Sequence, residues 1–155
     1  MNQDYRDRMK LENQLCFPLY AAARSITGFY SPYLKPLGLT YTQYIVFLVL
    51  WEKDEIPVGE ICKKLMLDNG TITPLLKKMQ TAGYIERNRS AEDDRVVVIS
   101  LTKKGRELQE QAKDIPACVA GCISFPNEKA KELYDLLYEL LDACRTGISE
   151  KGKER

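Results

Sequence analysis

Cysteine is the residue type in this chain best suited to side-chain chemistry, because its thiolate is a nucleophile. Five cysteines occur, at positions 16, 62, 118, 122 and 144, and there is no histidine. The lack of histidine excludes histidine-based triads and most catalytic zinc sites. No CxxC pair occurs, which argues against a structural zinc site as well. We therefore expect neither a metal nor another cofactor.

The composition is that of a globular protein, with 45% hydrophobic and 29% charged residues in a chain of 155. The first residues are charged and polar, unlike a signal peptide, and no apolar run is long enough to span a bilayer. We expect a cytoplasmic protein with no membrane partner. In that reducing compartment a disulfide framework is not expected.

The net charge is only +1, but the charge is distributed unevenly. Residues 62–106 contain ten Lys or Arg and five Asp or Glu, whereas residues 127–142 contain two basic and five acidic residues. A local concentration of positive charge is typical of a surface that binds nucleic acid.

Residues 67–83 lie within the basic region and have the pattern of a helix that reads DNA. Its apolar residues recur at helical spacing on one narrow stripe: Ile72, Leu75, Leu76 and Met79. Asp68 is placed to cap the N-terminus, and Gly83 to end the helix in a left-handed conformation. The opposite face is small, polar and cationic. We expect its contacts with the major groove and phosphates to come from Thr71, Thr73, Pro74, Lys77 and Lys78.

Taken alone, that face fits an ordinary solvated helix better than a DNA-binding one, but its neighbours reverse this preference. Residues 56–65 are predicted as a helix with Pro57 in its first turn, so a short turn completes a helix-turn-helix. Beyond Gly83 an alternating run, a polar tip and a β-branched run ending at Thr102 predict a two-stranded hairpin, the wing of a winged helix. Its tip should bring cations to a minor groove: Arg87, Arg89 and Arg95. An ion pair between Asp93 and Arg95 within the wing is a competing or additional role.

The remaining segments are predicted to be helical. Residues 8–30 and 127–144 carry apolar stripes, residues 41–52 form a buried central helix capped by Thr40, and residues 103–113 follow a cap at Thr102. Pro18 should bend the first helix beside Cys16, unless that helix starts only near Phe17. The terminal stripes need a second surface, and the simplest is the same stripes on another subunit.

The predicted fold is thus mostly α with a small β-hairpin wing: a winged helix-turn-helix with N- and C-terminal dimerisation helices. Residues 1–40 and 105–155 would form the dimerisation region and residues 41–104 the DNA-binding region. A homodimer would place two reading helices about 34 Å apart, which suits a pseudo-palindromic double-stranded DNA operator.

Several segments resemble the MarR family of winged-helix regulators. The wing signature D-x-R-x5-LT of that family is matched by DDRVVVISLT. Nearly the whole chain is similar, more closely, to the organic hydroperoxide resistance regulators, the OhrR group. The segments that carry this resemblance are LENQLCFPLYAAAR, GLTYTQYIVFLVLWE and LDNGTITPLLKKMQTAGYIERNRSAEDDR.

The resemblance implies a repressor that an organic hydroperoxide switches off by oxidising one cysteine, here Cys16. It implies that Tyr30 and Tyr41 of the partner subunit hydrogen-bond the thiolate and that Tyr20 shifts on oxidation. The oxidised sulfur would be trapped by Cys122, by Cys118 or by a small thiol. The group usually has a small helix-forming residue at the position of Pro18, so the geometry around Cys16 is expected to differ here.

Two other functions are compatible with parts of the sequence. One is a MarR-type repressor released by a small aromatic ligand, with Cys16 a packed structural residue. The other is a thiol peroxidase, but the chain shows no thioredoxin-like βαβ pattern, and that activity would leave the basic helix and wing without a purpose. We therefore predict a regulator and not an enzyme.

Overall fold

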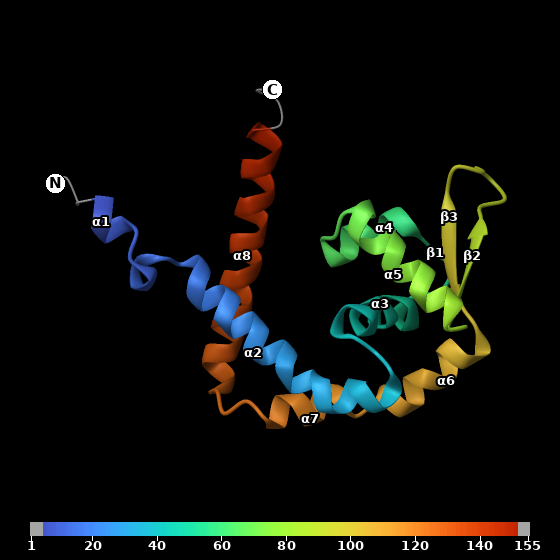
Figure 1. Cartoon of the computed structure of the whole chain (residues 1–155), viewed down its shortest axis with the longest axis horizontal. Coiled ribbons are helices and arrows are strands. Elements are labelled where there is room, and N and C mark those ends of the chain that lie inside the picture. Colours follow the sequence, from blue (N-terminus) through green and yellow to red (C-terminus); the bar gives the residue numbers. More distant parts are fainter. Residues whose placement is uncertain (1–4, 152–155) are drawn as a thin grey trace. The chain divides into compact units, whose positions relative to one another are not determined.

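The computed structural model describes the backbone of residues 5–151 and the side chains as far as Arg145. The chain forms two compact units, Met1–Val119 and Ala120–Arg155. Among the described residues, the first unit contains all the strands and the helices before α7, α7 crosses the boundary, and the second unit contains the long helix α8 (Figure 1). The predicted division at residues 40 and 104 remains a prediction.

The elements follow one another in the expected order. In the first unit they are α1 (Tyr5–Arg8), the 3-10 helix η1 (Leu11–Asn13), α2 (Cys16–Leu34), η2 (Lys35–Leu37), α3 (Tyr41–Glu52), β1 (Ile56–Pro57), α4 (Val58–Leu65), α5 (Asn69–Thr81), β2 (Ile85–Arg89), β3 (Val97–Leu101), α6 (Lys103–Ala112) and most of α7 (Ile115–Gly121). In the second unit α8 covers Asn127–Lys151. The predicted fold class, mostly α with a small β wing, is confirmed.

The wing belongs to a three-stranded antiparallel sheet in the order β1-β3-β2, so the prediction of two strands was incomplete. The third strand is β1, in which Ile56 pairs with Ile99 of β3. The predicted helix from residue 56 begins only at Val58, with Pro57 as its N-cap residue. Two residues are too few for a periodic pattern, and the buried Ile56 side chain is what ties this segment to the sheet.

The predicted single helix over residues 8–30 was wrong, because α1 ends at Arg8 and α2 begins only at Cys16. Pro18 is therefore the third residue of α2, where its missing N–H leaves no intrahelical bond unmade. The alternative start near Phe17 is the one the structure adopts. At the other end α2 extends beyond the predicted residue 30, through Pro32 to the buried Leu34.

The core of the first unit is built around α3, as its apolar sequence predicted. The largest fully buried side chains include Tyr44, Phe47 and Leu50 of α3, together with Ile72 and Leu76 of α5. Thr40 caps α3 in a reciprocal capping box with Gln43. The helix α5 buries Ile72, Leu76 and Met79 on one face and leaves its other face exposed.

The predicted ends of the reading helix are present. Asp68 accepts a hydrogen bond from the backbone N–H of Thr71 at 2.8 Å, and Gly83 has a φ of 75°. Thr102 caps α6 by accepting from the backbone N–H of Gly105 at 3.2 Å. These caps define where α5 ends and where β2 and α6 begin.

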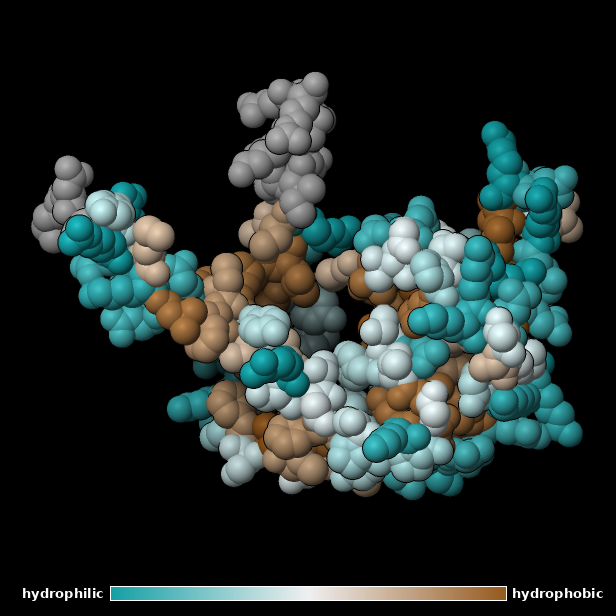
Figure 2. All heavy atoms as spheres, viewed as in Figure 1, coloured by the Kyte–Doolittle hydropathy of each residue, from teal (hydrophilic) through white to brown (hydrophobic). Residues whose placement is uncertain are grey.

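Large apolar side chains remain exposed on α2 and α8. On α2 and its approach they extend from Leu15 to Phe29, and Figure 2 shows apolar side chains along the arm at the left of the view. They include Leu15, Phe17, Tyr20 and Ile26 on α2 and its approach, and Leu133, Leu136 and Leu141 on α8. None of the described helices combines the length and hydrophobicity needed to cross a lipid bilayer.

Candidate DNA-binding surface and thiol sites

The outward face of α5 presents the side chains predicted for the DNA groove. Pro74, Lys77 and Lys78 are exposed, and Thr73 is half-buried. Thr71 is exposed, but its hydroxyl donates to the second carboxylate oxygen of Asp68 at 2.8 Å. This bond lowers the pKa of Asp68, together with the bond from the Thr71 backbone N–H. Thr71 is therefore engaged in the helix cap, and its methyl group is the part that can meet a base.

The cations of the wing occupy two different positions. Arg95 lies near the tip with its side chain 91% exposed, and its Nε donates to Asp93 at 3.2 Å. The pKa of Asp93 is lowered by hydrogen bonds from the backbone N–H and then from the side chain of Arg95. Arg89 ends β2 and is exposed. The ion pair expected within the wing is present, and it leaves most of the guanidinium accessible.

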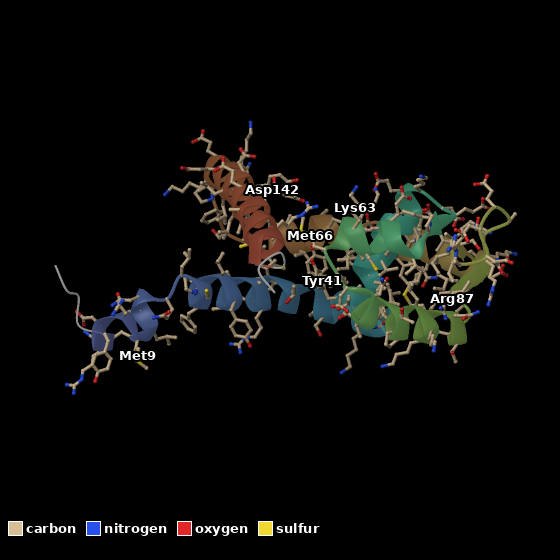
Figure 3. The ribbon with its side chains drawn as sticks, turned by 90° about the horizontal axis from the view of Figure 1, so that it is seen from above. Met9, Tyr41, Lys63, Met66, Arg87 and Asp142 are labelled. Carbon is tan, nitrogen blue, oxygen red and sulfur yellow. The ribbon has the colours of Figure 1, made fainter. Side chains whose placement is uncertain are left out.

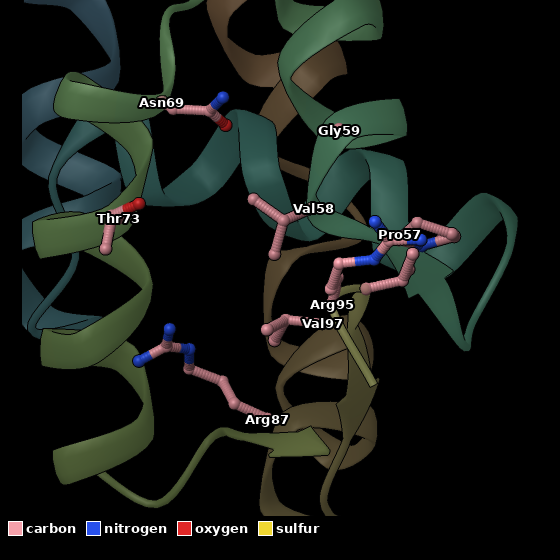
Figure 4. A pocket seen from close by; sticks show the side chains of 9 residues that line it. Pro57, Val58, Gly59, Asn69, Thr73, Arg87, Arg95 and Val97 are labelled. Carbon is pink, nitrogen blue, oxygen red and sulfur yellow. The ribbon is translucent and has the colours of Figure 1, made fainter. Parts of the chain in front are cut away.

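Arg87, expected at the tip of the wing, instead lies in the middle of β2, opposite Ile99 of β3. Its side chain is half-buried and points towards α5 (Figure 4). Its Nε is buried and has no hydrogen-bond partner among the described residues. A buried donor of this kind is costly unless something outside the chain accepts its hydrogen bond.

A cleft of about 420 Å³ separates the wing from α4 and α5. Its polar lining consists of Asn69, Thr73, Arg87 and Arg95, and its apolar lining includes Val58 and Val97 (Figure 4). None of the described residues that line it carries a carboxylate. The two guanidinium groups and the hydroxyl make it suited to an anionic group such as a phosphate or a carboxylate.

Cys16, the predicted sensor, is the first residue of α2 and is exposed. Its neighbours Leu15 and Phe17 are exposed apolar side chains, 66% and 45% accessible. A shallow cleft beside it is lined by Lys10, Leu11, Glu12 and Phe17. The thiol is therefore reachable from solvent within an apolar setting.

The structure brings Tyr30 and Tyr41 together but keeps both far from the Cys16 of the same chain. Their ring centroids lie 5.0 Å apart. The pKa of Tyr41 is raised by burial and then by Tyr30, so its hydroxyl remains a proton donor at neutral pH. Cys16 and Tyr30 both belong to α2, and fourteen residues at a rise of about 1.5 Å place them roughly 21 Å apart. Figure 3 labels Met9, near the outer end of the N-terminal helices, and Tyr41, which begins α3 beyond the opposite end of α2.

The other predicted redox residues are accessible. Tyr20 is 63% exposed, and the Arg24 guanidinium lies 5.6 Å from its ring centroid, a cation–π contact that the sequence did not single out. Cys118 and Cys122 are exposed in and just after α7. None of the five cysteines, all within the described residues, is in a disulfide.

Cys62 differs from the other thiols because it is held inside the helix-turn-helix. Its Sγ donates to Asn69 Oδ1 at 3.3 Å, which joins α4 to the start of α5. Burial raises the pKa of this thiol, and the nearby carboxylate of Asp68 raises it further. Both effects favour the unreactive protonated form, so Cys62 is suited to a structural role.

Residues that the sequence did not single out hold the base of the wing. Asp54 accepts from the Leu101 backbone N–H at 2.8 Å and from Arg106 Nη1 at 2.7 Å. The indole N–H of Trp51 donates to the Gly105 carbonyl at 3.0 Å. These long-range bonds join the end of α3 to β3 and α6. Of these residues, only Trp51 could have been noticed in the sequence, because it is the single tryptophan of the chain.

Comparison with known proteins places these features in a family. Residues 28–112 match the family model described as transcriptional regulator SarA/Rot. The organic hydroperoxide resistance transcriptional regulator of Bacillus subtilis is 48% identical over 136 residues, which cover 88% of this chain and 92% of that protein. These matches show that the chain belongs among regulators of transcription and not among enzymes.

Two solved structures of AbfR, a protein of Staphylococcus epidermidis, are similar to this protein over most of its length. Reduced AbfR bound to DNA has a TM-score of 0.73 at 34% identity, covering 90% of this chain and 97% of that chain. Disulfide-formed AbfR has a TM-score of 0.61, also at 34% identity, covering 88% and 96%. The protein is thus a winged-helix transcriptional regulator of the MarR and SarA/Rot family and belongs to its redox-sensing organic hydroperoxide resistance group.

Proposed function

We propose that the protein is a homodimeric repressor that binds a pseudo-palindromic operator and releases it when an organic hydroperoxide oxidises Cys16. The observation that carries this proposal is the separation along α2. A thiol and a tyrosine pair that are about 21 Å apart within one chain can act on the same sulfur only if a second copy supplies one of them.

The exposed apolar side chains support a dimer as the source of that second copy. Those on α2 and its approach run from Leu15, beside Cys16, to Phe29, and those on α8 form a second apolar set. Exposed patches of this kind mark contact surfaces. A two-fold axis would place the N-terminal end of α2 of one subunit against Tyr30 and Tyr41 of the other.

The chemistry at Cys16 follows from its exposure and its apolar neighbours. The thiolate sulfur attacks the terminal oxygen of the hydroperoxide, so an S–O bond forms and the O–O bond breaks. The alkoxide leaves and takes up a proton to become an alcohol, while the sulfur is oxidised by two electrons to a sulfenic acid. Condensation with a second thiol then gives a disulfide and water.

Which thiol traps the sulfenic acid is part of the proposal. We favour Cys122 of the partner subunit. The alternatives are Cys118 and a small thiol from solution. Both chain cysteines are exposed. A covalent dimer on non-reducing gels after cumene hydroperoxide treatment is expected for the wild type. A Cys122→Ser protein that still forms it would remove Cys122 as the partner thiol.

DNA binding is assigned to the outward face of α5 and to the wing. Pro74 and Lys77, with the half-buried Thr73 beside them, would meet base edges in the major groove, and Lys78 a phosphate. Arg95 and Arg89 would reach the minor groove. The buried Nε of Arg87 faces the cleft between the wing and α5, where a backbone phosphate would satisfy it.

A gel-shift assay on DNA upstream of the protein's own gene tests the proposal. We expect the reduced protein to bind, cumene hydroperoxide to abolish the shift, and Cys16→Ser to bind in both conditions. Oxidation that leaves the wild-type shift intact would contradict the proposal. Binding to the chromosome would place the protein in the cytoplasm.

A second candidate is a repressor released by a small aromatic ligand, with Cys16 structural. The cleft beside Arg87 and Arg95 is the observation that favours it, because two guanidinium groups would suit an aromatic acid. In that case Cys16→Ser would still be released by the ligand, and peroxide would have no effect on the wild type.

A further inference from the structure

Five aromatic side chains form a continuous series of ring contacts from α2 to the joint between α5 and the wing. We call it the aromatic series, and in order it consists of Tyr30, Tyr44, Trp51, Phe47 and Tyr84. Successive centroids lie 5.7, 6.3, 5.2 and 5.5 Å apart. These separations fall in the range in which aromatic pairs attract one another. Tyr41 joins the first member at 5.0 Å.

The first end of the aromatic series lies at the tyrosine pair. Tyr30 contacts both Tyr41 and Tyr44, so the two residues assigned to the partner's thiol touch the buried core directly. Tyr44 is 1% exposed. A displacement of the Tyr30 ring therefore meets a side chain that has no solvent to move into.

The other end, Tyr84, is the residue on which the reading elements converge. Its carbonyl accepts from both the backbone N–H and the hydroxyl of Thr102, each at 3.0 Å. Its own hydroxyl donates to the Leu37 carbonyl at 3.4 Å, and Lys104 Nζ lies 4.3 Å from its ring centroid. Tyr84 directly follows Gly83, so its movement would shift the end of α5, the start of β2 and the start of α6 together.

The middle of the aromatic series is rigid. Phe47 is fully buried and stacks on Trp51 at an interplanar angle of 22°. The indole N–H of Trp51 is bonded to the Gly105 carbonyl. Close-packed interiors transmit strain, and packed elements switch between discrete arrangements instead of deforming continuously. A leucine at position 47 or 51 would still fill space, but it could change rotamer when its neighbour moved and so would not pass the displacement on.

We propose that the aromatic series couples oxidation of Cys16 to the position of α5 and the wing, with Phe47 and Trp51 as positioning residues. Neither residue touches the oxidised sulfur or DNA, so both act through their neighbours. The inference rests on the proposed function, because it assigns a route to a switch that the proposed function requires. A coupling route is established only by measuring the coupling itself.

The test compares Phe47→Leu and Trp51→Leu with the wild type and with two controls. Leu50→Val alters an equally buried α3 residue that is outside the ring contacts, and Trp51→Phe keeps a ring. The rate of Cys16 oxidation by cumene hydroperoxide is followed by mass spectrometry. The affinity for DNA upstream of the protein's own gene is measured for reduced and oxidised protein.

We expect both leucine variants to be oxidised at the wild-type rate and to bind DNA normally when reduced. On oxidation, their loss of affinity should be smaller than that of the wild type by about 2- to 30-fold. Trp51→Phe and Leu50→Val should lose affinity as fully as the wild type. Trp51 is only half-buried, so Trp51→Leu carries the test if Phe47→Leu does not fold.

Three results would overturn the inference. Full release of DNA by both oxidised leucine variants would reject the aromatic series while the proposed function stood. If oxidised Leu50→Val retained DNA affinity to the same extent as the leucine variants, the effect would be due to a general loss of core packing. A wild-type protein in which Cys16 is not oxidised, or which is oxidised without losing affinity, would reject the proposed function and the inference with it.

Discussion

At the scale of single residues, the five cysteines are distinguished by their surroundings. Cys16 is exposed at the start of a helix between apolar neighbours, whereas Cys62 is half-buried and bonded to Asn69. The sequence alone separated them only through resemblance to a family. The structure adds a physical reason: Cys62 lies next to the carboxylate that caps α5, and Cys16 does not.

The thiol of Cys62 is expected to respond to the charge of Asp68. Its pKa is raised by burial and then by Asp68, so less of it is thiolate at a given pH. Asp68→Asn keeps the capping oxygen but removes the charge. The pH midpoint for alkylation of Cys62 by iodoacetamide should move to lower pH, although burial should keep its pKa above the ordinary thiol value.

Peptide mass spectrometry across a pH series measures this midpoint, and Cys144 on α8 provides an internal control. An Asp68→Asn protein whose Cys62 profile overlays that of the wild type would show that the carboxylate has no influence on the thiol.

Arg95 is expected to contribute to DNA affinity through charge. Arg95→Ala should weaken operator binding and reduce the slope of log affinity against log salt concentration by about one, because one phosphate contact is lost. Lys113→Ala is a matched control, since it removes one positive charge from a lysine paired with Glu110 on α6. Fluorescence anisotropy over a salt series gives both slopes. Equal slopes in the wild type and Arg95→Ala would mean that Arg95 serves only its ion pair with Asp93.

At the scale of elements, the caps and the joint between the wing and α6 position the reading surface. The sequence predicted the caps because each is a local pattern: Asp68 before α5, Thr102 before α6, and Gly83 with a left-handed φ. It did not predict β1 or the bonds of Asp54. Those bonds join residues far apart in the chain, and no local pattern encodes the partner.

Gly105 is the tightest position in this joint. A Cβ atom there would lie 2.2 Å from the carbonyl oxygen of Tyr84, so backbone must shift. Gly105→Ala should lower the free energy of unfolding by about 1–3 kcal/mol, the usual effect of overpacking. Gly59→Ala in α4 is the control, because a Cβ there meets nothing within 4 Å.

Thermal unfolding at one fixed protein concentration compares the two variants. We expect a lower melting temperature for Gly105→Ala and an unchanged or slightly higher one for Gly59→Ala, since alanine favours a helix. Equal melting temperatures for Gly105→Ala and the wild type would show that the backbone around Gly105 can shift to accept a Cβ atom without a loss of stability.

At the scale of the whole molecule, the central feature of the proposed function is a sensing site that two copies of the chain would share. The winged-helix part is well packed around α3, but the apolar side chains of α2 and α8 are left exposed. Such a chain is expected to be stable only as a dimer, and its apparent stability should depend on concentration. Light scattering that shows a folded monomer at micromolar concentration would contradict this.

Mixed dimers test whether the tyrosines act on the partner's thiol. When one subunit carries Cys16→Ser and the other carries Tyr30→Phe with Tyr41→Phe, the remaining Cys16 faces intact tyrosines and should be oxidised at the wild-type rate. When one subunit carries all three substitutions and its partner is wild type, the remaining Cys16 faces two phenylalanines. Its oxidation should be slower by roughly tenfold or more, because hydrogen bonds to a charged group are lost.

Rapid-quench mass spectrometry of the single reactive thiol measures both rates. If the first mixed dimer were the slow one, the tyrosines would act on their own subunit's cysteine. That result would contradict the geometry of α2.

The sequence by itself determined the helix-turn-helix, the hairpin of the wing, the caps, the basic surface and the family, because these depend on local patterns of polarity and on short motifs. It also showed which thiols exist. Only the tertiary structure decided where α2 begins, that Arg87 faces a cleft instead of the wing tip, and that Tyr30 and Tyr41 meet at the start of the aromatic series. These features depend on contacts between residues distant in the chain, which packing selects and local propensity does not.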